Sequence, residues 1–360
     1  MTARNYFSAP LRCVAVTCLL ASLATAGVQD AHAADKAAKA AAPQVLFKIA
    51  TIAPDGSTWM KLMHEMDTRV REATGNEAGF KFYSGGVQGD ESLVLKKMRS
   101  GQLHGGGFTG NGLGAVAPSL RVMEIPFLIQ NEAELDAVHQ AYDAEFEKAL
   151  DSSGHVLLGW AEVGFIHLFT KKPVRNLTDL RNSKMWLWEG DPLPQSLFEV
   201  AGVSPVPLAY TDVYTSLQTG LIDGVYCSPY ACVVLQWHTQ VTSMSETPIS
   251  HGIGAVIVTK AAWSKLTPAS QAKIREIAQD VFARLRTSTR QDNKKALDDI
   301  RAAGIKSVPF DAAALAEFRK LGDQAAQKCV GSLYSADLLA RVRKTVLDVR
   351  SSAAPAGKSG

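Results

Sequence analysis

The side chains that could perform catalysis do not form a catalytic pattern. Ser228 and Cys227 are possible nucleophiles and His238 is a possible base. A nucleophile needs a base and an orienting group beside it, and no local signature joins these residues. The eight histidines show neither the His-x-x-x-His nor the cysteine spacing of a zinc site. We therefore expect a binding protein rather than an enzyme, with no metal or cofactor.

Aromatic side chains are the residues best suited to hold a small molecule. They concentrate between Lys184 and Pro229, where Trp186 and Trp188 share one face if the segment is a strand, because strand side chains alternate. A Trp-x-Trp strand can equally belong to a core, so the sequence leaves both roles open. Packing or helix capping also explains most of the further candidates. These candidates for ligand contacts are Trp59, Asn111, Phe165, His167, Glu189, Tyr210, Tyr226 and Trp237.

The segment that must position these residues alternates strands and helices. Met185 to Trp188 predicts a short strand, and Asp191 predicts the N-cap of a helix that Gly202 ends. Val203 to Leu208 predicts a short edge strand because it contains two prolines, and a second helix begins by Asp212. Such a β-α-β-α unit is typical of an open α/β sheet, which binds small molecules at the carboxyl ends of its strands.

Other segments fit the same fold class. Val45 to Ile52 and Phe80 to Tyr83 predict the first two strands, and Asp90 predicts the N-cap of the helix that follows. Ala231 to Val241 has a helical pattern. Ala269 to Ala303 predicts one long helix, which has room to cross two domains.

Composition and charge exclude several classes of partner. The chain has 46% hydrophobic and 20% charged residues, as an ordinary globular protein does. With 38 basic and 35 acidic residues the net charge is +3, which is too balanced to indicate nucleic acid or an anionic membrane as partner.

The N-terminus predicts export. Residues 1–33 combine a basic start, an apolar run and an Ala-x-Ala cleavage site at Ala31 to Ala33, which is the pattern of a signal peptide. Residues 34–43 predict a flexible leader and residues 351–360 a disordered tail. After them no apolar run is long enough for a membrane helix. We expect a periplasmic protein.

Three cysteines remain after the signal peptide, namely Cys227, Cys232 and Cys329. An odd number cannot pair completely within one exported chain. Cys227 and Cys232 could form a disulfide if the loop between them turns back, but buried free thiols are the more common state for such cysteines. The sequence leaves both states open.

These motifs together resemble the solute-binding proteins of TRAP (tripartite ATP-independent periplasmic) transporters, the DctP-like family. The resemblance rests on Lys184 to Leu187, Gly202 to Pro207 and Asp212 to Gly224, followed by Pro229. Upstream, the run FYSGGVQGDESLVLKKMRSGQLHGGGF and the later Ile-Pro-Phe resemble the first-domain signature of the family. The similarity extends from about Phe47 to about Val346.

The resemblance implies a fold and a mode of action. The fold would be a two-lobed, type II-like α/β binding protein with a cleft between the lobes and a long helix that spans them. Lobe I would comprise residues 44–163 and 252–292, and lobe II residues 164–251 and 293–350. The protein would be a monomer that captures one small molecule and delivers it to TRAP-type membrane permease subunits.

Two departures from the family pattern bear on the ligand. Many relatives place a carboxylate-binding arginine on the strand that here carries Trp186, and another arginine where this chain has Ile166. An indole offers one N–H and an apolar face, whereas a guanidinium offers paired donors and a charge. We therefore expect an apolar, aromatic or uncharged ligand. The alternatives are an organic acid held by Lys171, Lys172, Arg175 or the main chain, an exported enzyme, or a scaffold or signalling receptor.

Overall fold

A mixed sheet forms the frame of the protein. The computed structural model describes residues 42–353. In the main sheet the strand order is β10-β8-β4-β9-β3-β1-β2, and β7 also pairs with β4. A separate two-stranded sheet joins β5 and β6. The strands are β1 (Val45–Thr51), β2 (Ala78–Tyr83), β3 (Gly105–Thr109), β4 (His155–Thr170), β5 (Trp186–Trp188), β6 (Val206–Leu208), β7 (Gly224–Cys227), β8 (Ser243–Ser245), β9 (Ser250–Thr259) and β10 (Lys306–Val308).

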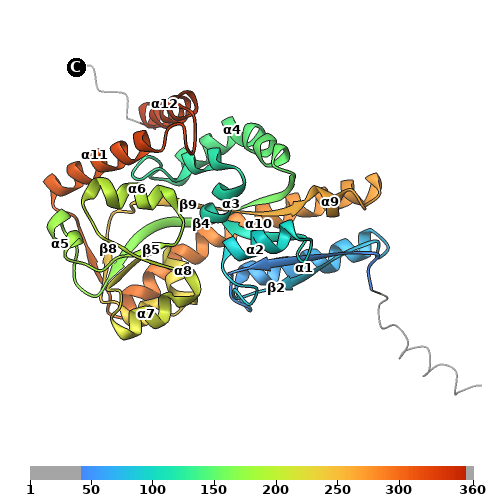
Figure 1. The fold of residues 1–360 in the computed structure, drawn as a ribbon, viewed down its shortest axis with the longest axis horizontal. Coiled ribbons are helices and arrows are strands. Elements are labelled where there is room, and N and C mark those ends of the chain that lie inside the picture. Colours follow the sequence, from blue (N-terminus) through green and yellow to red (C-terminus); the bar gives the residue numbers. More distant parts are fainter. Residues whose placement is uncertain (1–41, 354–360) are drawn as a thin grey trace, which may run out of the picture. The chain divides into compact units, whose positions relative to one another are not determined.

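Helices cover the sheet and its two ends (Figure 1). The α-helices are α1 (Thr58–Ala73), α2 (Glu91–Arg99), α3 (Gly110–Val116), α4 (Glu132–Ser152), α5 (Leu177–Arg181), α6 (Pro192–Ala201), α7 (Val213–Thr219), α8 (Pro229–Val234), α9 (Lys260–Trp263), α10 (Pro268–Ala302), α11 (Ala312–Lys328) and α12 (Ala336–Ala353). The 3₁₀ helices are η1 (Pro118–Glu124), η2 (Tyr210–Asp212) and η3 (Trp237–Gln240). Within residues 42–353, no helix is both long and apolar enough to cross a bilayer.

Two long antiparallel strands connect the halves of the main sheet. The first part of β4 pairs with β9, which also pairs with β3, and β3 pairs with β1 in parallel. The last part of β4 pairs instead with β7 and β8. The change of partners follows a register shift between Glu162 and Gly164. This arrangement confirms the predicted α/β fold class.

The predicted long helix is also confirmed. The helix α10 has 35 residues, and Thr267 caps it by accepting a hydrogen bond from the Ser270 N–H. Phe282 and Leu285 pack with β1 and β9 in one hydrophobic cluster, whereas Ile300 packs with Trp186 and Trp237 in another. The helix therefore contributes to the hydrophobic packing of both halves of the sheet.

Two local predictions were wrong. The helix expected from Ala231 to Val241 is divided into α8 and η3, because Gln236 adopts a left-handed conformation with φ of 62°. The chain was also expected to be disordered from Ser351, but α12 continues to Ala353. The predicted signal peptide, the predicted leader up to residue 41 and the predicted tail from residue 354 lie outside the described residues.

The lobe division stays a prediction, and one segment packs differently from it. We expected residues 336–350 to accompany lobe II. In the structure Leu338, Val342 and Val346 of α12 pack in one hydrophobic cluster with Leu135 and Val138 of α4. The C-terminal helix thus returns to the half of the molecule that contains α3 and α4 (Figure 1).

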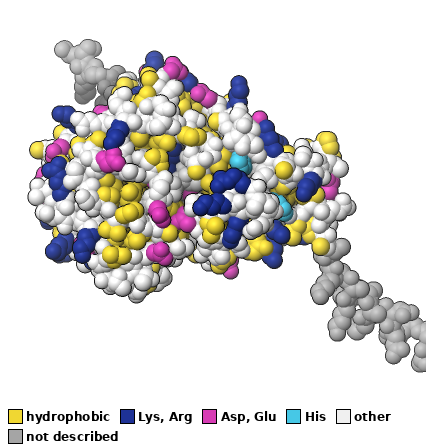
Figure 2. All heavy atoms as spheres, viewed as in Figure 1, with side chains coloured by type: hydrophobic (Ala, Val, Ile, Leu, Met, Phe, Trp, Pro, Cys, Tyr) yellow, Lys and Arg dark blue, Asp and Glu magenta, His cyan; other side chains and the backbone are white. Residues whose placement is uncertain are grey.

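Charges are mixed over the visible surface. Figure 2 shows lysine and arginine side chains interspersed with aspartate and glutamate, without a large region of one sign. This pattern agrees with the near-zero net charge, which gives no long-range field to attract a polyanion.

Candidate functional site

A cavity of about 250 Å³ lies among residues from both halves of the chain. Its walls come from the ends of β1 and β3, from η1 and β4, and from β5, η2, β7 and α8. An engineered cavity of about 150 Å³ is known to hold benzene. The cavity in this protein is therefore large enough for a molecule larger than a single aromatic ring.

Stacked aromatic rings form one wall of the cavity. The ring of Trp186 lies 5.0 Å from that of Tyr226 in a stacked arrangement, and 5.6 Å from the rings of both Trp188 and Trp237. The rings of Trp188 and Tyr210 stack at 5.5 Å. Such ring pairs add about 0.5–1.5 kcal/mol each beyond the area that they bury. The wall is therefore a packed, preformed apolar surface.

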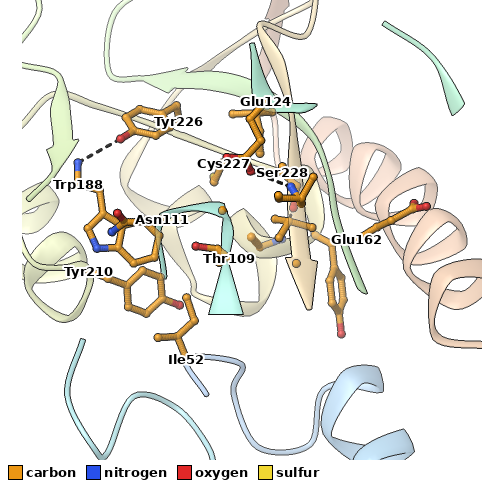
Figure 3. Close-up of a pocket in the computed structure, with 18 of the residues that line it drawn as sticks. Ile52, Thr109, Asn111, Glu124, Glu162, Trp188, Tyr210, Tyr226, Cys227 and Ser228 are labelled. Carbon is orange, nitrogen blue, oxygen red and sulfur yellow. Dashed lines mark hydrogen bonds between the residues drawn. The ribbon is translucent and has the colours of Figure 1, made fainter. Parts of the chain in front are cut away.

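Hydrogen bonds fix the orientation of these rings. Trp186 Nε1 donates to the Leu208 carbonyl of β6 at 3.0 Å, so its indole offers the cavity only ring surface. The Trp188 backbone N–H donates to Tyr226 Oη at 3.1 Å (Figure 3). Burial raises the pKa of Tyr226 and of Tyr210 above the ordinary value, so both phenols are neutral at physiological pH.

Most of the predicted site residues line the cavity. They are Trp59, Asn111, Trp186, Trp188, Tyr210, Tyr226 and Trp237. Trp186 is only 2% exposed and belongs as much to a hydrophobic cluster as to the cavity wall. Ile166, at the position where the resemblance implied an arginine in relatives, also lines the cavity.

Three predicted residues are not among the lining residues. Phe165 packs edge-on against the His251 ring at 5.1 Å. His167 is buried, and its Nδ1 is 2.8 Å from the Ser245 carbonyl, with which it shares a hydrogen bond. Glu189 lies exposed in the turn after β5. The strand alternation that places Ile166 at the cavity directs its two neighbours elsewhere.

Sequence reasoning missed a buried ion cluster formed by Arg121, Glu124 and Asp191. The side chains are 4% to 10% exposed, and all three residues line the cavity. Arg121 Nη2 donates to both Asp191 carboxylate oxygens, at 2.8 and 3.0 Å. Arg121 and Glu124 lie three residues apart within the otherwise apolar run from Leu120 to Ile125, and that spacing was the one available signal. Asp191 was predicted as an N-cap, a role that it also has.

The cluster sets the ionisation of its members. Burial lowers the pKa of Arg121, but the charges of Asp191 and Glu124 outweigh burial and raise it above the ordinary value. Burial raises the pKa of Glu124, which the Arg121 charge opposes and the Asp191 charge reinforces. Arg121 therefore stays charged, and its charge is balanced within the cluster.

A second buried carboxyl supports the loop that carries Asn111. Glu91 accepts hydrogen bonds from the N–H groups of Thr109 and Gly112, both at 2.7 Å, and from Thr109 Oγ1 at 3.0 Å. Burial raises the pKa of Glu91 to about 7, although these hydrogen bonds favour the ionised form. No described hydrogen bond involves the amide of Asn111, which is therefore available to a ligand.

Asp90 connects its own segment to two residues that line the cavity, Trp188 and Tyr210. It occupies the N-cap position of α2, but its side chain makes no hydrogen bond to that helix. Its carboxylate instead accepts from Trp188 Nε1, at 3.0 and 3.2 Å, and from the Tyr210 N–H at 2.9 Å. These contacts join the segment after β2 to β5 and η2.

The candidate catalytic residues do not assemble. Ser228 Oγ accepts from the Ala231 N–H as the N-cap of α8. Burial raises the pKa of the Cys227 thiol well above its ordinary value, which makes it a poor nucleophile. Cys227, Cys232 and Cys329 are buried free thiols. Within residues 42–353, no group of three or more His, Cys, Asp or Glu residues is arranged to hold a metal ion.

The fold and the cavity define a two-lobed α/β protein that binds a small molecule. The chain belongs to the family described as bacterial extracellular solute-binding protein, family 7 (DctP), which matches residues 49–332. This match confirms the resemblance found in the sequence. A solute-binding protein of Chromohalobacter salexigens is 28% identical over 278 residues, which cover 74% of this chain and 81% of the relative.

Solved structures of TRAP proteins share the fold. A TRAP periplasmic solute-binding protein from Xanthobacter autotrophicus, with bound β-D-galacturonate, aligns with a TM-score of 0.77 at 20% identity. That alignment covers 83% of this chain and 99% of the other. The sugar acid binding protein from Advenella mimigardefordensis, in complex with galactonate, aligns with a TM-score of 0.78 at 17% identity over 86% of this chain and 99% of the other.

Proposed function

We propose that this protein is the receptor of a TRAP-type transporter and that its two lobes close on a small molecule with an apolar or aromatic body and no free negative charge. The family match supports the receptor role. The aromatic wall supports the nature of the ligand, because its rings offer stacking surface and the indole N–H groups of Trp186 and Trp188 are used within the protein.

The electrostatics of the cavity carry the proposal. Among the described lining residues, Arg121 is the one cationic side chain, and it already pairs with Asp191 and Glu124. Two more carboxylates, of Glu162 and Asp292, also line the cavity. A desolvated ligand carboxylate needs an uncommitted positive partner, and this cavity supplies none. A neutral ligand meets no such cost.

Transport would use the same closure without chemistry. The protein would act in the periplasm after removal of residues 1–33 and deliver its ligand to TRAP-type permease subunits. The ligand shifts the population toward the closed state through contacts that exist only when both lobes touch it. The aromatic wall and the β1–α1 and β3–α3 connections would make those contacts.

Capture of an organic acid is the second candidate function. It is favoured by the two similar structures above, whose ligands, galacturonate and galactonate, both carry a carboxylate. The basic residues that could replace the missing arginines give it no support. Lys171, Lys172 and Arg175 do not line the cavity, and Lys171 Nζ donates to the Leu217 carbonyl at 2.5 Å.

Native mass spectrometry of the purified protein tests the proposal. The expected result is a copurified compound with an aromatic or apolar body and no negative charge, released on denaturation. Calorimetric titration with galacturonate should show no binding at millimolar concentration. The Ile166→Arg variant should bind galacturonate, because it restores a guanidinium to the cavity. Tight binding of galacturonate by the unchanged protein would instead establish the organic-acid function.

A further inference from the structure

The charges that line the cavity are mostly negative. Among the described lining residues there is one guanidinium, of Arg121, and there are four carboxylates, of Glu124, Glu162, Asp191 and Asp292. Arg121 is already paired with Asp191, at 2.8 and 3.0 Å. Burial raises the pKa of Glu124, but even a protonated Glu124 leaves three carboxylates against one guanidinium. The lining therefore favours a cation over an anion.

Asp292 of α10 is the lining carboxylate without a partner. Glu162, by contrast, is bonded to Arg290 at 2.6 and 2.9 Å. Within residues 42–353, the Asp292 side chain makes no hydrogen bond or ion pair. Its Oδ2 is buried, whereas its Oδ1 keeps accessible surface and is the oxygen that a ligand can reach. A carboxylate partly withdrawn from water is costly when unpaired, so a cation beside it is stabilised.

The basic residues near Asp292 on α10 are bound to other carboxylates. Arg290 pairs with carboxylates of β4 and α4. Lys294 Nζ lies 3.8 Å from a carboxylate of α4. Lys295 Nζ donates to Asp299, one turn further along α10, at 2.7 Å. The positive partner of Asp292 therefore has to come from outside the described chain.

A second acceptor lies beside Asp292 on the same face of α10. Thr289 precedes Asp292 by three residues, and side chains at that spacing are neighbours on a helix surface. Thr289 also lines the cavity, and its hydroxyl makes no hydrogen bond within the described part of the chain. An ammonium group has several N–H donors, so one charged and one neutral oxygen side by side suit it.

The aromatic wall lies at the other end of the cavity. Figure 3 shows Trp188 and Tyr226 on one side of the cavity and Glu162, which is bonded to Arg290 of α10, on the other. The faces of aromatic rings attract cations and offer no partner to an anion. A ligand with an apolar body against the wall and an ammonium group toward α10 is therefore stabilised at both ends.

We infer that Asp292 and Thr289 form a subsite for a protonated amine at one end of the ligand. The inference rests on the proposed function, whose ligand has an apolar or aromatic body and no negative charge, and it narrows that ligand to an amine cation. The ammonium group donates to Asp292 Oδ1 and to Thr289 Oγ1 while the body lies against the aromatic wall.

Calorimetric titration with compounds that differ only in their polar end tests this inference. The set combines phenyl, naphthyl and indolyl bodies, each carrying an ethylamine, an ethanol or an acetate side chain. At neutral pH the amines are cations, the alcohols neutral and the acids anions. For the body that fits best, the amine should bind at least about tenfold more tightly than the alcohol, since tenfold corresponds to about 1.4 kcal/mol. The acid should bind most weakly.

Two variants separate pairing with Asp292 from a general effect of charge. Asp292→Asn keeps the shape and removes the charge, so the ratio of amine to alcohol affinity should fall at least about fivefold. The affinity for the alcohol should stay within about twofold of the original, which shows that the cavity is intact. Asp298→Asn is the matched control, because it removes a carboxylate from the same helix whose side chain is 78% exposed and outside the lining. The control should leave the ratio within about twofold of the original, since solvent screens an exposed charge.

Each other outcome has a distinct meaning. If the alcohol binds the original protein as tightly as the amine, the inference fails while the proposed function stands. If Asp292→Asn and Asp298→Asn change the ratio equally, the amine does not pair with Asp292 and the inference fails. If the acid binds most tightly, or if no compound of the set binds at millimolar concentration, the proposed ligand itself fails, and the inference with it.

Discussion

His251 is a buried ionisable residue outside the cavity lining. It lies on β9 at 1% exposure, and its Nδ1 has no hydrogen-bond partner. Burial lowers the pKa of His251 to about 3, helped by the nearby positive groups of His139 and Arg290 and opposed by Asp136. The imidazole therefore stays neutral in the folded protein.

This residue should make stability depend on pH. The pKa of His251 is about 3 in the folded state against an ordinary value of 6.5, so below pH 6.5 the unfolded chain binds the proton first. The contribution of neutral His251 to the free energy of unfolding is complete above pH 6.5. It falls as pH decreases toward 3, by about 1.4 kcal/mol per pH unit. Urea unfolding at pH 7.5 and at pH 5.5 gives the loss in free energy of unfolding between the two pH values. This loss should be about 1 kcal/mol smaller for His251→Phe than for the original protein. Equal losses in the two proteins would contradict the predicted role of His251.

Residue roles were predictable only where a local pattern determines them. Strand alternation placed Trp186 and Trp188 on one face, and their rings do lie 5.6 Å apart. The sequence could not show that the indole N–H of Trp186 bonds to Leu208, because that pairing depends on how β5 and β6 meet. The role of Arg121 was hidden for the same reason, since its partner Asp191 lies 70 positions away.

At the scale of elements, the start of α2 connects two parts of the chain. The N-cap residue Asp90 bonds to Trp188 and Tyr210 instead of to its own helix. If those segments belong to opposite lobes, these bonds stabilise the closed arrangement. Each hydrogen bond to a charged group contributes about 1.5–3 kcal/mol.

Asp90→Ser should therefore favour the open state. Serine is a good N-cap, so α2 keeps its stability while the bonds to Trp188 and Tyr210 are lost. Small-angle X-ray scattering of the ligand-free protein should show a larger radius of gyration for the variant. Asp311→Ser is the matched control, because Asp311 is also an N-cap without a side-chain capping bond, at the start of α11. Identical scattering from both variants would contradict the inference that Asp90 stabilises the closed state.

One arginine of α10 forms ion pairs with both β4 and α4. Arg290 donates to Glu162 of β4, at 2.6 and 2.9 Å, and to Asp136 of α4, at 2.5 and 3.0 Å. The Glu162 side chain is 6% exposed, so losing Arg290 would leave a carboxylate both buried and unpaired.

Arg290→Met should lower the free energy of unfolding by about 3–5 kcal/mol, the usual cost of breaking a buried ion pair. Arg301→Met, which removes an exposed pair with Asp298 from the same helix, should cost less than about 1 kcal/mol. Chemical denaturation at pH 7.5 measures both values. Similar losses of unfolding free energy in the two variants would show that the Arg290–Glu162 pair contributes no more stability than an exposed ion pair.

Helix prediction succeeded where the hydrophobic periodicity extends over many residues. It failed where a single backbone angle determines where the helix ends. The amphipathic pattern of Ala269 to Ala303 located α10 to within one residue at each end. The pattern from Ala231 to Val241 was also helical, but the left-handed conformation of Gln236 ends the helix there. Glutamine, unlike glycine or asparagine, gives no sequence signal for that conformation.

At the scale of the whole molecule, the two halves of the sheet meet at Gly164. Its φ is 110°, and a Cβ there would lie 2.5 Å from Nδ2 of Asn293 on α10. Asn293 in turn donates to the Val163 carbonyl at 3.1 Å and accepts from the Tyr230 N–H at 3.0 Å. Elements β4, α10 and α8 therefore converge at the register shift of β4, just before its pairing passes from β9 to β7.

Gly164→Ala should destabilise the protein by about 2 kcal/mol or more, from backbone strain and from displacement of Asn293. Gly154→Ala is the control, since Gly154 also has a positive φ, of 87°, but no atom lies within 4 Å of its would-be Cβ. Thermal unfolding measures the difference between the two variants, which isolates packing at the junction. Equal effects would assign the whole cost to backbone conformation.

The overall architecture was predictable because family motifs recur along most of the chain. The position of α12 was not, since its apolar stripe fits any complementary surface and only the folded molecule shows that α4 provides it. Hydrophobic patterning predicts which face of a helix is buried, but it does not predict which element packs against that face.

The aromatic wall has one practical consequence. Of the six tryptophans in the sequence, Trp59, Trp186, Trp188 and Trp237 line the cavity. Most of the tryptophans that give the protein its ultraviolet emission therefore lie beside the proposed solute site. Solute binding should therefore change the wavelength or intensity of the intrinsic tryptophan fluorescence, so binding can be followed without an attached dye.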